Sequence, residues 1–235
     1  MPSPEKQKRW VGDHGVSLMS RSCSVIRLFD ILSWRTTGAG LNGKRILDYG
    51  CGWGRLLRLM NYYSDVANVV GVDPMQDSLD ACAQSEVPNK VWRIDTRPSP
   101  DEPHGAGSDF DFVYLFSVFS HTPEEVTLAI LRKIARMTTS DAVVVGTIRT
   151  IEWVSVRQGV WAEENISALK RTYEATGYGF VPISGDKNLA RADYGDTIMT
   201  PDYYAKLVAA AGWKIAAIDR DVLEPFQICV ALKKI

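Results

Sequence analysis

Apolar residues in this chain fall into short continuous runs that alternate with helical patterns. The runs at residues 45–49, 68–72, 90–94, 111–117 and 142–147 predict five strands of a buried parallel sheet. Periodic apolar positions and capping residues predict helices at 16–36, from about 54, at 77–84 and at 122–137. This alternation is typical of an α/β fold with helices on both faces of the sheet.

The alternation of strands and helices stops after the fifth strand. Residues 148–199 are rich in aromatic side chains and glycines, and only one helix, near 163–175, is predicted there. An irregular segment of this length in a compact domain is usually a lid or a substrate loop. Its aromatic residues could line a sugar-binding wall or could form a small core of the insert.

Regular structure resumes at Thr200-Pro201-Asp202, where an N-cap residue followed by proline predicts a helix that Gly212 ends. Strands at 213–219 and 226–232 then bring the sheet to seven strands. The whole chain, 1–235, therefore reads as one domain with four parts: a helical cap at 1–43, a cofactor-binding core at 44–147, a lid insert at 148–199, and a closing helix with two strands at 200–235.

Composition restricts the partners of the protein. There are 27 Lys and Arg against 28 Asp and Glu, the net charge is −1, and no basic run stands out, which argues against a nucleic-acid substrate. The four cysteines are scattered without metal-ligand spacing, so we expect free thiols and no metal. A polar N-terminus and the lack of a long apolar run predict a cytoplasmic protein without membrane insertion.

The strongest motif is the stretch from Arg45 to Arg55, in which a short strand leads to Asp48 and then to three alternating glycines, Gly50, Gly52 and Gly54. Glycines allow a sharp turn and a close approach of a ligand to the backbone. A following helix directs free N–H groups and its positive end toward that turn. The G-x-G-x-G spacing differs from the dinucleotide fingerprint G-x-G-x-x-G.

This stretch resembles motif I of class I S-adenosylmethionine (SAM) methyltransferases. The resemblance implies a Rossmann-like sheet, SAM as cofactor and S-adenosylhomocysteine as product, with Asp48 near the methionine amino group and Asp95 near the adenine amino group. Asp73, at the end of the second strand, either binds the ribose hydroxyls or only forms a turn before Pro74. Arg55 either meets the methionine carboxylate or caps the fold. Further residues expected at the cofactor site are Cys51, Pro74, Phe116 and Ser117.

A second segment narrows the resemblance. Residues 110–125 contain Ser117-Val-Phe-Ser-His121, similar to the Ser-Val-Phe-(Ser/Thr)-His segment of a methyltransferase group associated with polysaccharide and glycolipid assembly. The last strand is also similar, although Ile228 stands where that group usually has an acid. The resemblance covers residues 44–147 well and 196–235 loosely, and it implies a carbohydrate or other small-molecule acceptor.

A sugar hydroxyl is a poor nucleophile, so a general base is useful, and histidine is the commonest one. His121 follows the fourth strand, at the sheet edge where ligands bind in such folds. It is the candidate base, although it could instead shape the pocket by bonding to the backbone. His14 is the alternative. Residues expected to contact the acceptor are Tyr173, Tyr178 and Tyr194.

Three other functions remain open at this point. An NAD(P)-dependent oxidoreductase is disfavoured by the glycine spacing and by the lack of a Tyr-x-x-x-Lys pair. A non-catalytic SAM-binding protein would keep the same cofactor motif. A methyltransferase acting on nitrogen, carbon or another hydroxyl would share that motif too, because the motif recognises the cofactor and not the acceptor.

Overall fold

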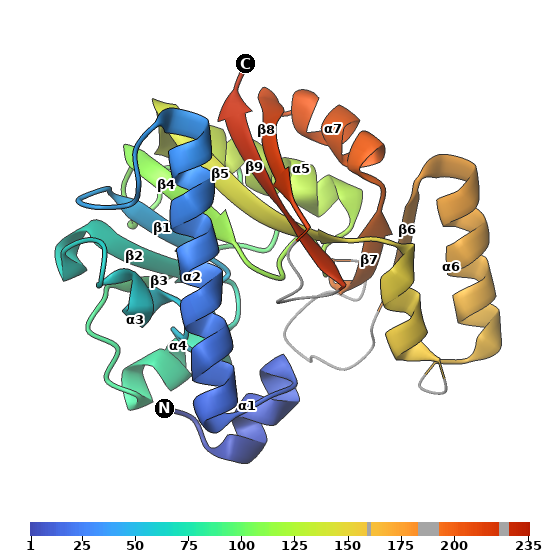
Figure 1. Cartoon of the computed structure of the whole chain (residues 1–235), viewed down its shortest axis with the longest axis horizontal. Coiled ribbons are helices and arrows are strands. Elements are labelled where there is room, and N and C mark those ends of the chain that lie inside the picture. Colours follow the sequence, from blue (N-terminus) through green and yellow to red (C-terminus); the bar gives the residue numbers. More distant parts are fainter. Residues whose placement is uncertain (159–160, 183–192, 221–225) are drawn as a thin grey trace. The chain divides into compact units, whose positions relative to one another are not determined.

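The computed structural model describes residues 1–158, 161–182, 193–220 and 226–235 (Figure 1). The chain divides into two compact units that interleave in the sequence. The first unit consists of Met1–Asp95, Pro103–Tyr114 and Met137–Val143. The second consists of Thr96–Glu102, Leu115–Arg136 and Val144–Ile235.

Helices and strands alternate through most of the chain. The helices are α1 (Pro4–Val11), α2 (Gly15–Thr37), α3 (Leu57–Met60), α4 (Gln76–Gln84), α5 (Glu124–Met137), α6 (Glu163–Thr176) and α7 (Pro201–Ala209), with short 3₁₀ segments η1 (Val66–Asn68) and η2 (Ile151–Arg157). The strands are β1 (Ile46–Tyr49), β2 (Val69–Asp73), β3 (Val91–Arg93), β4 (Phe110–Leu115), β5 (Thr138–Arg149), β6 (Tyr178–Pro182), β7 (Gly195–Met199), β8 (Trp213–Asp219) and β9 (Gln227–Lys234).

Seven of these strands form one sheet in the order β3-β2-β1-β4-β5-β9-β8. β1 pairs in parallel with β2 and β4, and β2 pairs in parallel with β3. β9 runs antiparallel to both β5 and β8. The prediction of a seven-stranded, mostly parallel, Rossmann-like α/β sheet is confirmed.

In the first unit, every residue of β1 and β2 is buried, as their continuous apolar runs predict. The long helix α2 packs beside β4 through Phe29, whose ring centroid lies 5.2 Å from that of Tyr114 and 6.3 Å from that of Phe112. α2 ends at Gly38, whose left-handed conformation (φ 73°) closes the helix as the sequence predicts.

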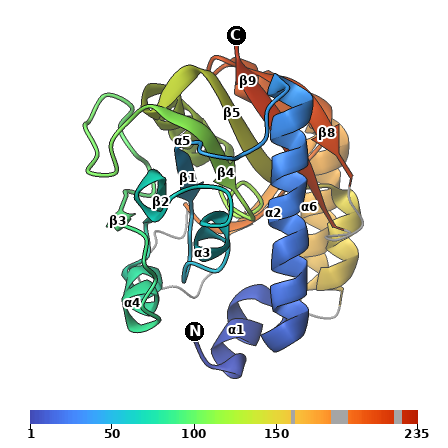
Figure 2. The same ribbon diagram turned by 60° about the vertical axis from the view of Figure 1, so that its left-hand side comes forward.

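Helix α1 is a finding that the hydrophobic pattern does not predict. Its N-cap is Ser3, whose hydroxyl accepts a hydrogen bond from the backbone N–H of Lys6, and a proline follows at the first helical position. The side chains of Trp10 and Val11, at its end and largely buried, pack on a cluster formed by Leu18, Trp53 and Ala81. Figure 2 shows α1 beside the first turns of α2.

In the second unit, α5 begins at Glu124, two positions after the start that the sequence predicts at residue 122. The Thr122 hydroxyl bonds to the Thr127 hydroxyl at 2.9 Å and to the Val118 carbonyl at 3.4 Å. The backbone N–H of Glu124 is satisfied by the hydroxyl of Tyr178, 3.0 Å away. A side chain remote in the sequence therefore does what a local cap was expected to do.

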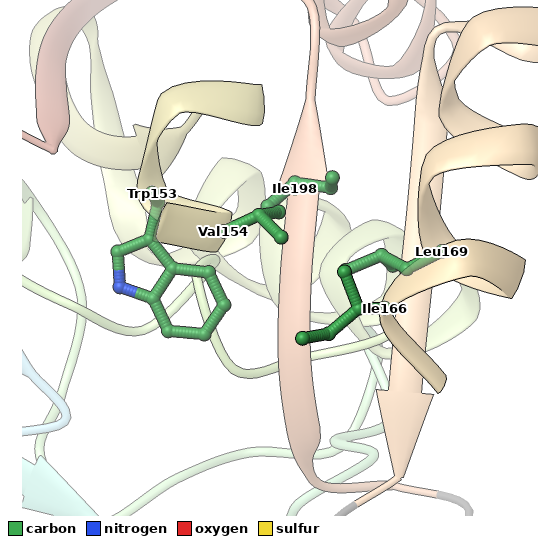
Figure 3. Packing of buried hydrophobic residues seen from close by; sticks show 5 residues of the cluster. All are labelled: Trp153, Val154, Ile166, Leu169 and Ile198. Carbon is green, nitrogen blue, oxygen red and sulfur yellow. The ribbon is translucent and has the colours of Figure 1, made fainter. Parts of the chain in front are cut away.

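The insert after β5 has its own hydrophobic core. Figure 3 shows Trp153, Val154, Ile166, Leu169 and Ile198, which come from η2, α6 and β7 and pack together. Partly buried hydrophobic side chains extend this cluster: Ile151, Trp161, Tyr173 and Val181. Of the two roles left open for the insert's aromatic residues, the formation of a small core is confirmed for the tryptophans.

The insert also contains the antiparallel pair β6–β7, which the sequence analysis does not predict. Glycines weaken a strand pattern, and here one lies in each strand. A Cβ atom on Gly179 would come within 2.6 Å of the Leu169 side chain, so the glycine lets α6 pack closely on β6. Residues 159–160 and 183–192 of the predicted lid lie outside the described residues.

We expect Thr200→Ala to lower the free energy of unfolding by about 1 kcal/mol. The Thr200 hydroxyl accepts a hydrogen bond from the backbone N–H of Tyr203 at 3.1 Å and so caps α7. Thr200→Ser keeps the hydroxyl and serves as the control. Urea unfolding curves of the two variants would contradict this role if both lost the same stability.

Candidate functional site

The glycine turn after β1 has a backbone shape that only glycine adopts easily. Gly50, Gly52 and Gly54 have φ angles of 82°, 54° and 76°, all in the left-handed region. The turn is tied to the end of β2, because the N–H groups of Gly50 and Cys51 donate to the Val72 carbonyl at 2.8 and 3.0 Å. The three-glycine spacing is therefore a conformational requirement of this turn.

Asp73 fixes the turn from the neighbouring strand. One of its carboxylate oxygens accepts a hydrogen bond from Gly52 N–H and the other accepts one from Met75 N–H, each at 2.9 Å. The residue is only 5% exposed. Burial raises the pKa of Asp73, while the backbone hydrogen bonds from Met75 and Gly52 oppose that rise. Because a carboxylate oxygen can accept more than one hydrogen bond, both oxygens keep capacity for a ligand.

Asp48 is a second buried carboxylate in the same unit. It lies in β1, in register with Tyr114 of β4, and is 3% exposed. Burial raises the pKa of Asp48 to about 7; the Tyr114 hydroxyl and the charge of Arg55 act against this rise, and the charge of Asp73 adds to it. A cation placed beside Asp48 would relieve the cost of this buried charge.

Other residues expected at the cofactor site occupy different positions in the first unit. Arg55 donates from Nη1 to the Ser22 hydroxyl of α2 at 2.7 Å. Cys51 is buried with its sulfur 3.7 Å from the Gly52 carbonyl oxygen, Pro74 is half-buried, and Asp95 is exposed at the end of β3. Arg55 thus links the glycine turn to α2.

The turn fits a ligand such as SAM. A Cβ atom built on Gly52 would meet nothing within 4 Å, so a ligand can approach the backbone at this point. Two acidic side chains of the same unit, Asp73 at the turn and Asp48 in β1, offer hydrogen-bond acceptors. Hydroxyl and ammonium groups suit these acceptors.

His121 belongs to the second unit, after β4, where its ring contacts several groups. Its Nδ1 atom lies 2.8 Å from the Gly195 carbonyl oxygen, and its Nε2 atom lies 3.1 Å from Nη2 of Arg149. The ring stacks on Tyr194, with centroids 5.2 Å apart and planes 10° apart. The backbone of His121 also accepts a hydrogen bond from Gly195 N–H at 2.9 Å, so the β7 strand holds the whole residue.

Arg149 and Asp196 are central to this cluster, and the sequence analysis does not identify either. Arg149 Nη1 lies 2.8 Å from Asp196 Oδ1, and that same oxygen lies 3.4 Å from His121 Nδ1. Asp196 has no exposed surface, and Arg149 is 7% exposed. The sequence offers one signal for Asp196, because this acid directly precedes the mostly apolar run Thr197-Ile-Met199. The run lies in a segment that the sequence analysis treats as an irregular insert.

Phe116 and Ser117, expected at the cofactor site, lie in the second unit at the end of β4, and both are half-buried. Ser117 has a φ of 62°, an unusual value for a residue other than glycine. Its N–H donates to the Thr147 hydroxyl at 2.8 Å, and its own hydroxyl bonds to the Gln227 side chain. These contacts hold the backbone in this conformation just before His121.

The remaining predicted residues are placed as follows. His14 is exposed at the N-cap position of α2, and its side chain makes no capping hydrogen bond there. Tyr173 packs at the edge of the insert core. Tyr178 stacks on Tyr203, with ring centroids 5.0 Å apart, and bonds to α5. Of the three tyrosines expected to contact the acceptor, only Tyr194 lies against His121.

Within the described part of the chain, no group of three or more His, Cys, Asp or Glu side chains is arranged to hold a metal ion. The described helices also include none with the length and apolar character needed to span a membrane.

We expect the stability of the ligand-free protein to depend on pH through Asp48. Its pKa of about 7 in the folded state exceeds the ordinary value near 4, so the folded state binds more protons between these values. The stability associated with the protonated carboxyl is complete below about pH 4 and is lost as the pH rises through 7. Asp48→Asn removes this loss, on the order of 4 kcal/mol. Urea unfolding at several pH values measures the free energy of unfolding of the wild type and of Asp48→Asn. The same dependence on pH in both proteins would contradict the prediction.

The chain was compared with known families and structures. A family model described as "Methyltransferase domain" matches residues 27–218. Solved structures of similar fold include magnesium protoporphyrin IX methyltransferase from Synechocystis PCC 6803 with bound S-adenosylhomocysteine (TM-score 0.59, 16% identity, covering 98% of this chain and 94% of that chain). Another is the PH0226 protein from Pyrococcus horikoshii OT3 (TM-score 0.62, 12% identity, 98% and 99%).

A third similar structure is the glycopeptide N-methyltransferase MtfA complexed with sinefungin (TM-score 0.62, 11% identity, covering 91% of this chain and 94% of that chain). A comparison with curated proteins found no match. The structural similarities concern the fold, whereas the family match extends over most of the sequence. This chain belongs to the methyltransferase-domain family.

Proposed function

We propose that this protein is a SAM-dependent methyltransferase that methylates a hydroxyl group of a carbohydrate, such as an oligosaccharide, a polysaccharide or a glycolipid precursor. The observation that supports SAM as the cofactor is the left-handed glycine turn, which is hydrogen-bonded to Asp73. The observation that supports a hydroxyl acceptor is His121, a base held between Tyr194 and polar partners in the second unit.

Three acids are assigned to SAM. Asp73 accepts hydrogen bonds from the ribose hydroxyls, Asp48 pairs with the ammonium of the methionine moiety, and Asp95 binds the adenine amino group. When bound, SAM supplies an electrophilic methyl group on a positively charged sulfur. The hydrogen bond between Arg55 and Ser22 supports a role for Arg55 in holding α2, in place of a contact with the methionine carboxylate.

The acceptor side of the proposal rests on the insert and on His121. We assign Tyr194, whose ring stacks on His121 with centroids 5.2 Å apart, to contact with the apolar C–H face of a sugar. His121 removes the proton of the reacting hydroxyl at Nε2. We assign the 148–199 segment to acceptor binding, with its own core keeping the aromatic side chains in place.

We expect calorimetry to detect binding of SAM and S-adenosylhomocysteine and no binding of NAD. Asp73→Ala should weaken SAM binding by ~1–3 kcal/mol, since a hydrogen bond to a charged group contributes on that scale. Asp77→Ala, an exposed change of the same kind in α4, is the matched control. Tight NAD binding, or equal SAM affinity in the Asp73 and Asp77 variants, would contradict the assignment.

We expect His121→Ala to lower turnover ~100- to 10,000-fold, the usual contribution of a general base, with SAM affinity nearly unchanged. Transfer of radiolabelled methyl from SAM to a panel of oligosaccharides and glycolipid precursors measures this effect, with amine and carboxylate metabolites as competing acceptors. His104→Ala controls for the loss of a histidine, and His14→Ala tests the alternative base. Intact turnover in His121→Ala would overturn the role of this residue, and methylation of the amines alone would overturn the carbohydrate class.

A further inference from the structure

The contacts of His121 determine which of its ring nitrogens carries the proton. A guanidinium group has only donors, so Arg149 Nη2 donates to Nε2 across 3.1 Å and Nε2 is the acceptor. In the neutral ring the proton is therefore on Nδ1, which donates to the Gly195 carbonyl at 2.8 Å. Free imidazole side chains in water favour the opposite tautomer, so the protein selects this one.

Asp196 lies on the Nδ1 side of the same ring. Its Oδ1 atom is 3.4 Å from Nδ1 and 2.8 Å from Arg149 Nη1, and the residue is fully buried. Arg149 Nη1 also donates to the Ser120 carbonyl at 3.1 Å, and the guanidinium lies over the Trp153 ring at 4.2 Å. The hydrogen bond from Nη2 to Nε2 must break before Nε2 can accept another proton.

We propose that Arg149 and Asp196 are positioning residues for His121, an inference that rests on the proposed function. Arg149 keeps Nε2 unprotonated and turned toward a donor, and the hydroxyl of the acceptor replaces Arg149 as that donor. The hydroxyl proton would move to Nε2 as the acceptor oxygen takes the methyl group that bound SAM would supply, which would leave S-adenosylhomocysteine with both electrons of the former carbon–sulfur bond. Asp196 stabilises the imidazolium that results, the logic of a histidine–carboxylate pair.

The proton then leaves Nε2 for solvent, since 20% of the His121 side-chain surface is exposed. Asp196 keeps its ion pair with Arg149 throughout. In this arrangement the buried ion pair acts on the reaction only through the imidazole ring, and it need not touch either substrate.

The first test needs no substrate. Nitrogen-15 NMR of the histidine rings in the full-length protein, with His121→Gln to assign the signal, should show His121 protonated at Nδ1 and unprotonated at Nε2. The double variant Arg149→Met/Asp196→Leu removes both charges of the buried pair, so neither is left alone. The Gly195 carbonyl still accepts from Nδ1 in that variant, so the Nε2–H tautomer should gain population without replacing the Nδ1–H form. A wild-type ring protonated at Nε2 would overturn the inference without any variant.

The second test separates turnover from binding. With the oligosaccharide that the wild-type enzyme methylates fastest, Asp196→Asn and Arg149→Lys should lower kcat ~10- to 100-fold, a part of the general-base contribution, with the acceptor KM changed by less than about threefold. The control pair is Asp101→Asn and Arg136→Lys, which changes an exposed ion pair of the same type (3.2 Å) outside the segment assigned to acceptor binding. Both control variants should turn over like the wild type.

The outcomes distinguish this inference from the proposed function. If His121→Ala turns over normally, the general base is wrong whatever the tautomer. If His121→Ala loses turnover while Asp196→Asn and Arg149→Lys keep wild-type kcat, only the positioning role is wrong. An equal loss of kcat in the Asp101 and Asp196 variants would also overturn it, because a general change in charge would then explain the effect.

Discussion

The hydrogen bonds of the Asp73 carboxylate are the interaction on which the candidate cofactor site depends. One buried side chain joins the end of β2, the glycine turn after β1 and the start of α4. A buried carboxylate without donors would be very unfavourable, and a turn of three left-handed glycines has little intrinsic preference for one shape. Each therefore stabilises the other: the turn supplies an N–H group, and the acid selects the conformation that presents it.

This arrangement places two buried acidic side chains in the first unit. Asp48 and Asp73 are both buried, and the charge of Asp73 makes ionisation of Asp48 less favourable. Arg55 is near, but its guanidinium is also engaged with Ser22. A ligand that brings hydroxyl groups and a positive charge would satisfy these carboxylates. The electrostatics of the turn thus favour the kind of ligand that the glycine spacing indicates.

Local sequence patterns predicted most of the fold because each feature was encoded by neighbouring residues. Continuous apolar runs marked the sheet, and Thr200 with Pro201 marked α7. Features that depend on distant residues were missed or predicted wrongly. Glu124 N–H is satisfied by Tyr178, 54 positions later, and not by Thr122. Arg149 and Asp196 lie 47 positions apart, so no local spacing brings them together. The polar helix α1 has no periodic pattern of apolar residues, so it was not predicted, although Ser3 followed by Pro4 is a capping signal.

The contrast between features encoded by neighbouring residues and features that depend on distant ones also explains why the acceptor is harder to infer than the cofactor. Similar folds carry a porphyrin methyltransferase and a glycopeptide methyltransferase, so the shared sheet does not select the acceptor. In this chain, the groups around the His121 ring come from the end of β5 or from the insert: Arg149, Tyr194, Gly195 and Asp196. The insert therefore supplies both the ring that stacks on His121 and the groups that face its Nδ1 atom. Under the proposed function, a change in this segment would alter acceptor choice and base chemistry together, because Tyr194 and Asp196 are only two positions apart.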